Sequence, residues 1–177
     1  MRSRPVSLTA ALKRVRLLLC DVDGVLTDAT VFIGGAGEVK QFNIQDGLGL
    51  VRLRREGLKV GWISSRPSPA TTRRATELKI DFLRQEKGSK VGVVESLLAQ
   101  IGFRWDEVCY VGDDIVDLGV LKRAGVAVAV ANGVAEVRAA ADYVTRAGGG
   151  HGAVREVVEL ILKAQHKWAR IVAEHAV

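Results

Sequence analysis

Acidic residues follow two short apolar segments of this sequence, at spacings that could hold a metal ion and attack a phosphorus atom. The residues concerned are Asp21 and Asp23 after one segment, and Asp113, Asp114 and Asp117 after a later one. A single Asp in such a place is commonly a helix N-cap, but two facing carboxylate clusters repel each other unless a cation lies between them. Hard oxygen ligands suit Mg²⁺. The sequence therefore predicts a magnesium site.

Two further polar residues could serve the same chemistry. Ser64 follows another apolar segment, and Lys90 begins a segment with helical periodicity. A carboxylate can attack phosphorus and form an aspartyl-phosphate when a metal and cationic donors neutralise the charge. The hydroxyl and the ammonium are suitable donors, and a second carboxyl group could protonate the leaving oxygen and then deprotonate water. Together these residues predict a Mg²⁺-dependent phosphatase.

These residues need a scaffold that brings the ends of several strands together. Short β-branched or leucine-rich runs alternate with segments of helical periodicity, which is typical of an α/β fold with a doubly wound parallel sheet. Ligands of such sheets bind at the carboxyl ends of the strands, where the polar residues stand. The strands are predicted at 15–20, 59–63, 81–83, 108–111, 126–130 and 143–144. The helices are predicted at 48–56, 69–78, 90–101, 115–124 and 134–141.

Two segments break the alternation. A β-hairpin insertion is predicted at 29–43, after the first strand, because two strand-like runs flank the glycine-rich stretch 34–37. Apolar residues recur at helical spacing over 153–176, which predicts one long amphipathic C-terminal helix preceded by a mobile glycine-rich hinge. We expect a single domain over 1–177, since no linker or internal repeat divides the chain.

The composition restricts the class of protein further. With 177 residues, 48% hydrophobic and 26% charged, the chain has globular proportions, and no apolar stretch approaches the ~20 residues that cross a bilayer. The N-terminus has no signal-peptide pattern and there are only two cysteines, so we expect a cytoplasmic protein with free thiols and no membrane partner. The net charge of +6 favours an anionic partner, while an aromatic content of 5% argues against a surface that binds single-stranded nucleic acid by stacking. We expect no nucleic-acid partner, with a nucleic acid phosphatase as an alternative that the charge leaves open.

The ordered set of motifs resembles the haloacid dehalogenase-like superfamily. Its four motifs are matched in order by Asp21-x-Asp23-Gly-Val-x-Thr, Ser64, Lys90 and Gly112-Asp113-Asp114-x-x-Asp117. The resemblance implies a nucleophile at Asp21, a general acid/base at Asp23, and metal ligands at Asp21, Asp23 and Asp113. It also implies that Ser64 and Lys90 hold the phosphoryl oxygens, and that Asp114 and Asp117 support the acidic motif.

Segments outside these motifs resemble one family of that superfamily, the phosphatases of 3-deoxy-D-manno-octulosonate (Kdo) 8-phosphate. The segment 42–47 is similar to that family's substrate segment, and 149–156 to its C-terminal signature. The resemblance implies a homotetramer assembled through the hairpins, with no cap domain, a Mg²⁺ cofactor and a role in lipopolysaccharide precursor synthesis. The residues implied to contact the phosphorylated sugar acid are Asn43, Ile44, Gln45, Asp46, Gly47, Arg66 and Arg74.

Three departures from the family pattern keep other functions open. They are Ser65, Pro67 and Glu86, near the expected positions of the phosphate and of the substrate arginine. One alternative is a phosphatase of a nine-carbon 2-keto-3-deoxy sugar acid 9-phosphate, and another is a weakly catalytic interaction subunit on the same fold. A receiver-type signalling domain carries a similar set of residues, but its acidic pair precedes the phosphorylated Asp along the chain, and here the order is reversed.

Overall fold

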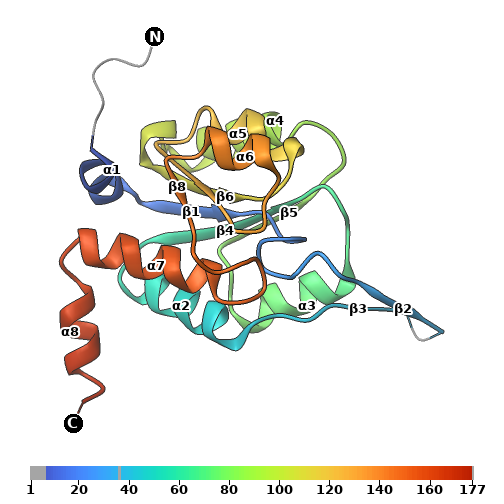
Figure 1. The fold of residues 1–177 in the computed structure, drawn as a ribbon, viewed down its shortest axis with the longest axis horizontal. Helices are drawn as coiled ribbons and strands as arrows, with labels where there is room; N and C mark the ends of the chain where they lie inside the picture. The colour runs from blue at the N-terminus through green and yellow to red at the C-terminus, as the bar shows by residue number, and fades with distance from the viewer. Residues whose placement is uncertain (1–6, 36, 177) are drawn as a thin grey trace.

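A six-stranded parallel sheet crosses the centre of the molecule, with its strands in the order β5-β4-β1-β6-β7-β8 (Figure 1). This computed structural model describes residues 7–35 and 37–176. The central strand β1 consists of apolar residues that are buried along its whole length, as expected for a strand covered on both faces. The strands are β1 (Leu17–Cys20), β4 (Lys59–Ser64), β5 (Phe82–Gln85), β6 (Val108–Gly112), β7 (Val126–Ala129) and β8 (Tyr143–Val144). The predicted doubly wound sheet is confirmed.

Helices cover both faces of this sheet because the side chains of each strand alternate between two apolar clusters. Leu18 and Cys20 of β1 pack in one cluster, while Leu17 and Leu19 pack in the other. The first face carries α1 (Leu8–Arg14), α2 (Ile44–Arg55), α3 (Pro69–Glu77) and α7 (Ala153–Ala164). The second face carries α4 (Lys90–Ile101), α5 (Leu118–Leu121) and α6 (Ala135–Ala140). No cap domain interrupts these elements within residues 7–35 and 37–176.

The hairpin is present, and it projects from the body of the molecule at the carboxyl end of the sheet (Figure 1). It consists of β2 (Phe32–Gly34) paired antiparallel with β3 (Gly37–Val39), and is therefore shorter than the predicted range 29–43. The pairing ends at Val39, and the side chain of the next residue, Lys40, is buried. Phe32, Ile33 and Val39 expose 60%, 82% and 61% of their surface.

The helices depart from the predicted ones most clearly in three places. The helix α1 occupies a stretch for which the sequence analysis predicts no element; it is capped by Ser7 and buries Leu12. The helix α2 begins at Ile44 instead of residue 48, because the Asn43 side chain accepts hydrogen bonds from the first free N–H groups of the helix. The predicted helix 115–124 is a 3₁₀ turn, η2 (Ile115–Asp117), followed by the short α5. A second 3₁₀ turn, η1 (Trp105–Glu107), precedes β6.

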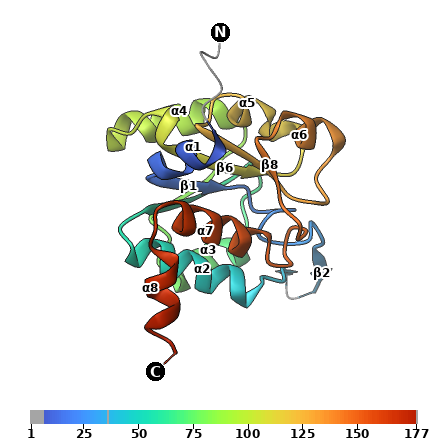
Figure 2. The same ribbon diagram turned by 60° about the vertical axis from the view of Figure 1, so that its left-hand side comes forward.

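The C-terminal segment forms two helices, so the prediction of one helix over 153–176 is wrong. After α7 the chain turns, and α8 (Trp168–Ala173) leads away from the sheet (Figure 2). His166 in the turn adopts a left-handed backbone with φ of 59°, and the Lys167 ammonium donates a hydrogen bond of 2.9 Å to the carbonyl of Glu56. This break allows Ile171 to be buried against the core. In the described part of the chain no helix has the length and apolar character needed to span a bilayer.

Candidate active site

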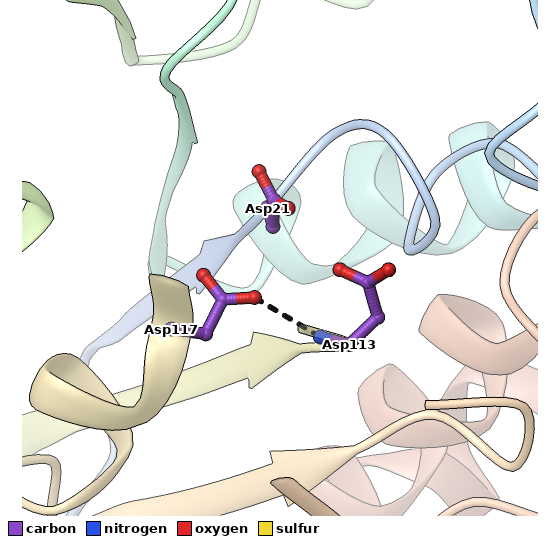
Figure 3. A group of neighbouring side chains, drawn as sticks. All are labelled: Asp21, Asp113 and Asp117. Carbon is purple, nitrogen blue, oxygen red and sulfur yellow. Dashed lines mark hydrogen bonds between the residues drawn. The ribbon is translucent and has the colours of Figure 1, made fainter. Parts of the chain in front are cut away.

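Parallel pairing of β1 with β6 brings the two predicted acidic segments to the same edge of the sheet. Cys20 pairs with Val111, and the Asp21 N–H donates a hydrogen bond of 3.0 Å to the carbonyl of Val111. One carboxylate oxygen each from Asp21, Asp113 and Asp117 lie within 4.8 Å of one another (Figure 3). We call these three residues the acidic cluster.

The electrostatics of the acidic cluster fit a divalent cation. Burial, followed by the negative charge of Asp117, raises the pKa of Asp21 to about 6. Burial, followed by the charge of Asp21, raises the pKa of Asp113 to about 8. The Oδ1 atom of Asp113 is also buried without a hydrogen-bond partner. A cation such as Mg²⁺ would supply both the missing partner and the missing positive charge.

Asp117 is completely buried and holds several groups of the site in place. Its carboxylate accepts hydrogen bonds from the Lys90 ammonium at 2.7 Å, the Tyr110 hydroxyl at 2.6 Å and the Asp113 N–H at 3.0 Å. Lys90 also lies 2.8 Å from Asp21. Burial lowers the pKa of Lys90, but the charges of Asp21 and Asp117 outweigh it and raise that pKa. The ammonium therefore stays charged beside the acidic cluster.

Tyr110 is a residue of this site that the sequence analysis does not identify. It is fully buried in the middle of β6, where the other side chains are apolar. A buried Tyr hydroxyl needs a hydrogen-bond partner, so the placement of Tyr in an apolar strand was a usable signal. Its partner is the Asp117 carboxylate, which ties the sheet to η2.

Glycines allow close packing around the loop that follows β1. Gly24 has a φ of +96°, and a Cβ at this position would overlap the carboxylate of Asp113. A Cβ at Gly149 would overlap the carbonyl of Gly24, and the Gly150 N–H donates a hydrogen bond of 3.0 Å to Val25. The glycine-rich stretch that was predicted to be a mobile hinge is therefore packed against the loop after β1.

Asp23 lies outside the acidic cluster, although it stands only two residues from Asp21. Its side chain is 31% exposed, and its Oδ1 lies 2.6 Å from the ammonium of Lys40. The Lys40 side chain has no exposed surface. The sequence analysis assigns Lys40 no role, because a lysine that follows a hairpin strand carries no sign of burial in the sequence.

Ser64 and Arg66 lie at the end of β4, the strand next to β1. The buried Ser64 hydroxyl accepts a hydrogen bond of 3.0 Å from the Arg66 N–H, which shapes the turn after the strand. Arg66 is exposed, and its guanidinium forms an ion pair with Glu38 of the hairpin. This ion pair connects the hairpin to the turn that follows β4.

The predicted substrate segment 43–47 forms the first turn of α2, and its residues differ in exposure. Ile44 and Gln45 are exposed, whereas Asp46 is buried and its carboxylate accepts a hydrogen bond of 2.7 Å from the Arg155 N–H at the start of α7. A Cβ at Gly47 would lie 2.6 Å from the Arg74 guanidinium, so this segment and that arginine are neighbours.

Two other features lie apart from the acidic cluster. Asp114 is exposed and caps η2 with its own side chain. A hollow of about 490 Å³ between α2, α7 and α8 is lined by apolar and cationic side chains, including Arg52, Trp168 and His175. None of the predicted catalytic or metal-binding residues is among the residues that line this hollow.

Comparisons with known proteins place this geometry among hydrolases. Residues 71–156 match the family model of the haloacid dehalogenase-like hydrolases. The 3-deoxy-D-manno-octulosonate 8-phosphate phosphatase of Yersinia pestis is 42% identical over 154 residues, which cover 86% of this chain and 82% of the relative. The phosphatase of the same name from Escherichia coli K12 is 40% identical over 166 residues, covering 92% and 88%.

Solved structures agree with these relatives. The crystal structure of the Moraxella catarrhalis phosphatase of that name, in complex with magnesium, phosphate and Kdo, has a TM-score of 0.92 at 39% identity. The similarity covers 94% of this chain and 97% of that one. The cobalt-bound phosphatase of Haemophilus influenzae has a TM-score of 0.86 at 37% identity, covering 89% and 92%.

Proposed function

This chain belongs to the Kdo 8-phosphate phosphatases of the haloacid dehalogenase-like hydrolases, and we propose that it hydrolyses Kdo 8-phosphate to Kdo and inorganic phosphate with Mg²⁺ as cofactor. The observation that carries this proposal is the acidic cluster with Lys90 between two of its members. Anionic oxygens for a cation and one buried ammonium for a phosphoryl group are what a phosphomonoester needs.

Asp21 is the proposed nucleophile. Lys90 lies 2.8 Å from one of its oxygens, which supports a role for the ammonium in orienting the carboxylate. The attacking oxygen forms a bond to phosphorus as the bond from phosphorus to the sugar oxygen breaks, leaving an aspartyl-phosphate. Lys90 and the Ser64 hydroxyl are the proposed donors to the phosphoryl oxygens. Ser64 ends β4, the strand next to β1, and the Lys90 ammonium at the start of α4 lies 2.8 Å from Asp21.

Asp23 is the proposed general acid/base. It would give a proton to the sugar oxygen in the first half-reaction and take a proton from water in the second. Its partial exposure supports this role, because both the leaving sugar and the incoming water must reach it from solvent.

The residues that would hold Mg²⁺ are Asp21, Asp113 and the backbone carbonyl of Asp23. When bound, Mg²⁺ neutralises charge on the phosphate and on the carboxylates around it. Asp117 would support the site by holding the Asp113 N–H and Lys90, as its hydrogen bonds indicate. For Asp114 we propose only a supporting role, through the cap it forms on η2.

The proposed contacts of the sugar acid are Arg66, Arg74 and the first turn of α2. A guanidinium can bind a carboxylate through two parallel hydrogen bonds, which suits a 2-keto acid. Arg66 reaches over the end of β4, and Arg74 lies beside Gly47, so the two arginines would approach the sugar from neighbouring elements.

We also propose that the protein acts as a homotetramer in the cytoplasm. The exposed apolar side chains of the hairpin support assembly, because a two-stranded hairpin is only marginally stable in water without partners. The absence of a cap among the described residues leaves the strand ends open to a neighbouring copy. Two buried free thiols, Cys20 and Cys109, suit a reducing compartment.

The test of this function is phosphate release by the purified protein with Mg²⁺ from a panel of substrates. The panel holds Kdo 8-phosphate, nine-carbon 2-keto-3-deoxy sugar acid 9-phosphates, simple sugar phosphates and an oligonucleotide. We expect the highest kcat/KM for Kdo 8-phosphate and a complete loss of activity in excess EDTA. A preference for the nine-carbon acid would keep the mechanism and change the substrate, and no turnover with Mg²⁺ would refute the proposal.

A further inference from the structure

The hollow of about 490 Å³ between α2, α7 and α8 has the size and the lining of a site for a small molecule. Figure 2 shows these three helices side by side. The apolar part of the wall consists of Leu48 from α2 and Trp168, Ile171 and Val172 from α8. Leu48 and Val172 each leave 50% of their surface exposed. Pockets for small molecules typically measure roughly 300–1,000 Å³ and have mostly apolar walls with a few polar groups.

The polar part of the wall contains two arginines and a histidine, and no carboxylate of the described chain belongs to the lining. One of the arginines, Arg155, has a carboxylate partner outside the wall, since its Nε donates a hydrogen bond of 2.9 Å to Glu159. Its guanidinium also lies over the ring of Trp168, 5.2 Å from the ring centre. The charge of Arg155 is therefore compensated within the chain, and its position is fixed.

Arg52, the other arginine, has no such compensation. Its Nη2 donates a hydrogen bond to Nε2 of His175, and among residues 7–35 and 37–176 it forms no ion pair with a carboxylate. Arg54, two residues further along the same helix, is paired with Asp81. A guanidinium carries five N–H donors, so most of those of Arg52 lack an acceptor within the described residues. The wall of the hollow therefore combines a large apolar surface with one unpaired, partly exposed cation.

We propose that this hollow binds a small monocarboxylate with an apolar body. The carboxylate would lie on the Arg52 guanidinium, which can hold it through two parallel hydrogen bonds. The apolar body would lie against Leu48, Ile171 and Val172. A monoanion matches the single unpaired cation, whereas a phosphate dianion would keep one charge without a partner beside apolar side chains. The hollow shares no residue with the proposed phosphatase site, so this proposal does not depend on the proposed function.

The test is a ¹⁹F NMR titration of the full chain labelled with 5-fluorotryptophan, which gives a signal for each of the three tryptophans. Trp168 lines the hollow, whereas Trp105 lies in η1 and packs against the other face of the sheet. The variant Trp168→Phe identifies the signal of Trp168. Octanoate should shift this signal and leave that of Trp105 unchanged. The shift should saturate with a Kd of about 1 mM, as expected for a ligand of about ten non-hydrogen atoms.

Three probes with the same alkyl chain separate the charge from the apolar contact. 1-Octanol lacks the charge, octylammonium reverses it, and octylphosphonate has a dianionic head without an ester bond that a phosphatase could cleave. We expect no saturation with 1-octanol up to its solubility limit or with octylammonium, and a Kd for octylphosphonate no lower than that for octanoate. Binding of 1-octanol as tight as that of octanoate, or a tenfold preference for octylphosphonate, would overturn the assignment to a carboxylate.

Two variants and a matched control locate the site. Arg52→Met removes the unpaired charge and should weaken octanoate binding at least about 10-fold, in the range for a hydrogen bond to a charged group. Val172→Asp places a carboxylate in the half-exposed wall and should abolish binding through repulsion. Arg55→Met is the control, because Arg55 is an exposed arginine of the same helix that does not line the hollow; its Kd should stay within about 2-fold of the wild-type value.

Circular dichroism should show the same fold in all of these variants, since none of the three replaced side chains is fully buried. An unchanged Kd in Arg52→Met, or no saturable shift of the Trp168 signal in the wild-type protein, would overturn the proposal. Failure of the proposed function looks different, because phosphate release would then be absent while the octanoate titration kept its expected course.

Discussion

The acidic cluster and the hairpin differ in whether their side chains have partners within the chain. At the carboxyl ends of β1 and β6, each buried charge meets an opposite charge or a hydrogen-bond donor, apart from the one free oxygen of Asp113. On the hairpin, Phe32, Ile33 and Val39 stand largely exposed to solvent. The proposed catalytic residues are thus arranged within one chain, whereas the exposed apolar surface of the hairpin supports the proposed assembly with other copies.

This difference implies that chemistry and assembly can be disturbed separately. Variants at the acidic edge should change turnover with little effect on assembly, and variants at the hairpin tip should do the reverse. The two regions meet only at Glu38 and Lys40, which belong to the hairpin segment but pair with Arg66 and Asp23. A deletion of the whole hairpin would therefore mix the two effects, and point substitutions are preferable.

The largest expected effect is that of Asp21→Asn. An amide cannot form the aspartyl-phosphate, so turnover should fall at least about 10³-fold, as on removal of other catalytic nucleophiles. The fold should be retained, because Asn has nearly the same volume and Lys90 keeps its partner Asp117. Phosphate release together with circular dichroism checks this, and an unchanged rate would eliminate the covalent mechanism.

Asp23→Asn should have the next largest effect. Loss of the proton donor and acceptor should lower kcat about 10²-fold or more, because both half-reactions use it. The proposed oligomer should remain intact, since Asp23 does not belong to the exposed apolar surface of the hairpin. Single-turnover and steady-state kinetics should both slow, and hydrolysis at the wild-type rate would show that the acid/base has been wrongly assigned.

The response to Mg²⁺ should depend on pH. The pKa values of Asp21 and Asp113 are raised in the folded protein from 3.8 to about 6 and about 8, so the metal-free fold loses stability as pH rises from about 4 through about 8. Mg²⁺ must displace these protons, and its apparent affinity should rise up to about tenfold per pH unit for each proton released. Thermal unfolding should show a larger Mg²⁺-induced increase in Tm at pH 8 than at pH 6.

Asp113→Asn is the control for that experiment. Of the two carboxyl groups with raised pKa values, it removes the one with the higher pKa, so both the Mg²⁺ effect and its dependence on pH should shrink. An equal Mg²⁺-induced shift in Tm at both pH values in the wild-type protein would contradict the assigned cation site.

The smallest effect on the isolated fold is expected for Phe32→Ser combined with Ile33→Ser. Both side chains are mostly exposed, so the free energy of unfolding should change by less than about 0.5 kcal/mol. Sedimentation should nevertheless show dissociation of the proposed tetramer, because the apolar contact between copies is lost. A tetramer that survives this double substitution would refute the proposed role of the hairpin.

Much of the fold was predictable because its signals are local. Buried parallel strands read as short apolar runs, and Pro69 in the first turn marks the start of α3. The start of α2 was placed too late, because Asn43 was not identified as its cap. The tail was harder, since no glycine or proline marks the break between α7 and α8. That break depends on Lys167 reaching Glu56, a contact between residues distant in the sequence.

Residue type and periodicity were sufficient to predict the doubly wound sheet, the positions of Asp21, Ser64 and Asp113 at strand ends, and the position of Lys90 at a helix start. Which charged groups are buried together is visible only in the tertiary structure. Lys40 and Tyr110 join the site through contacts with Asp23 and Asp117 that no local pattern records. Burial sets the strength of a charge pair, and burial results from the packing of elements that are far apart along the chain.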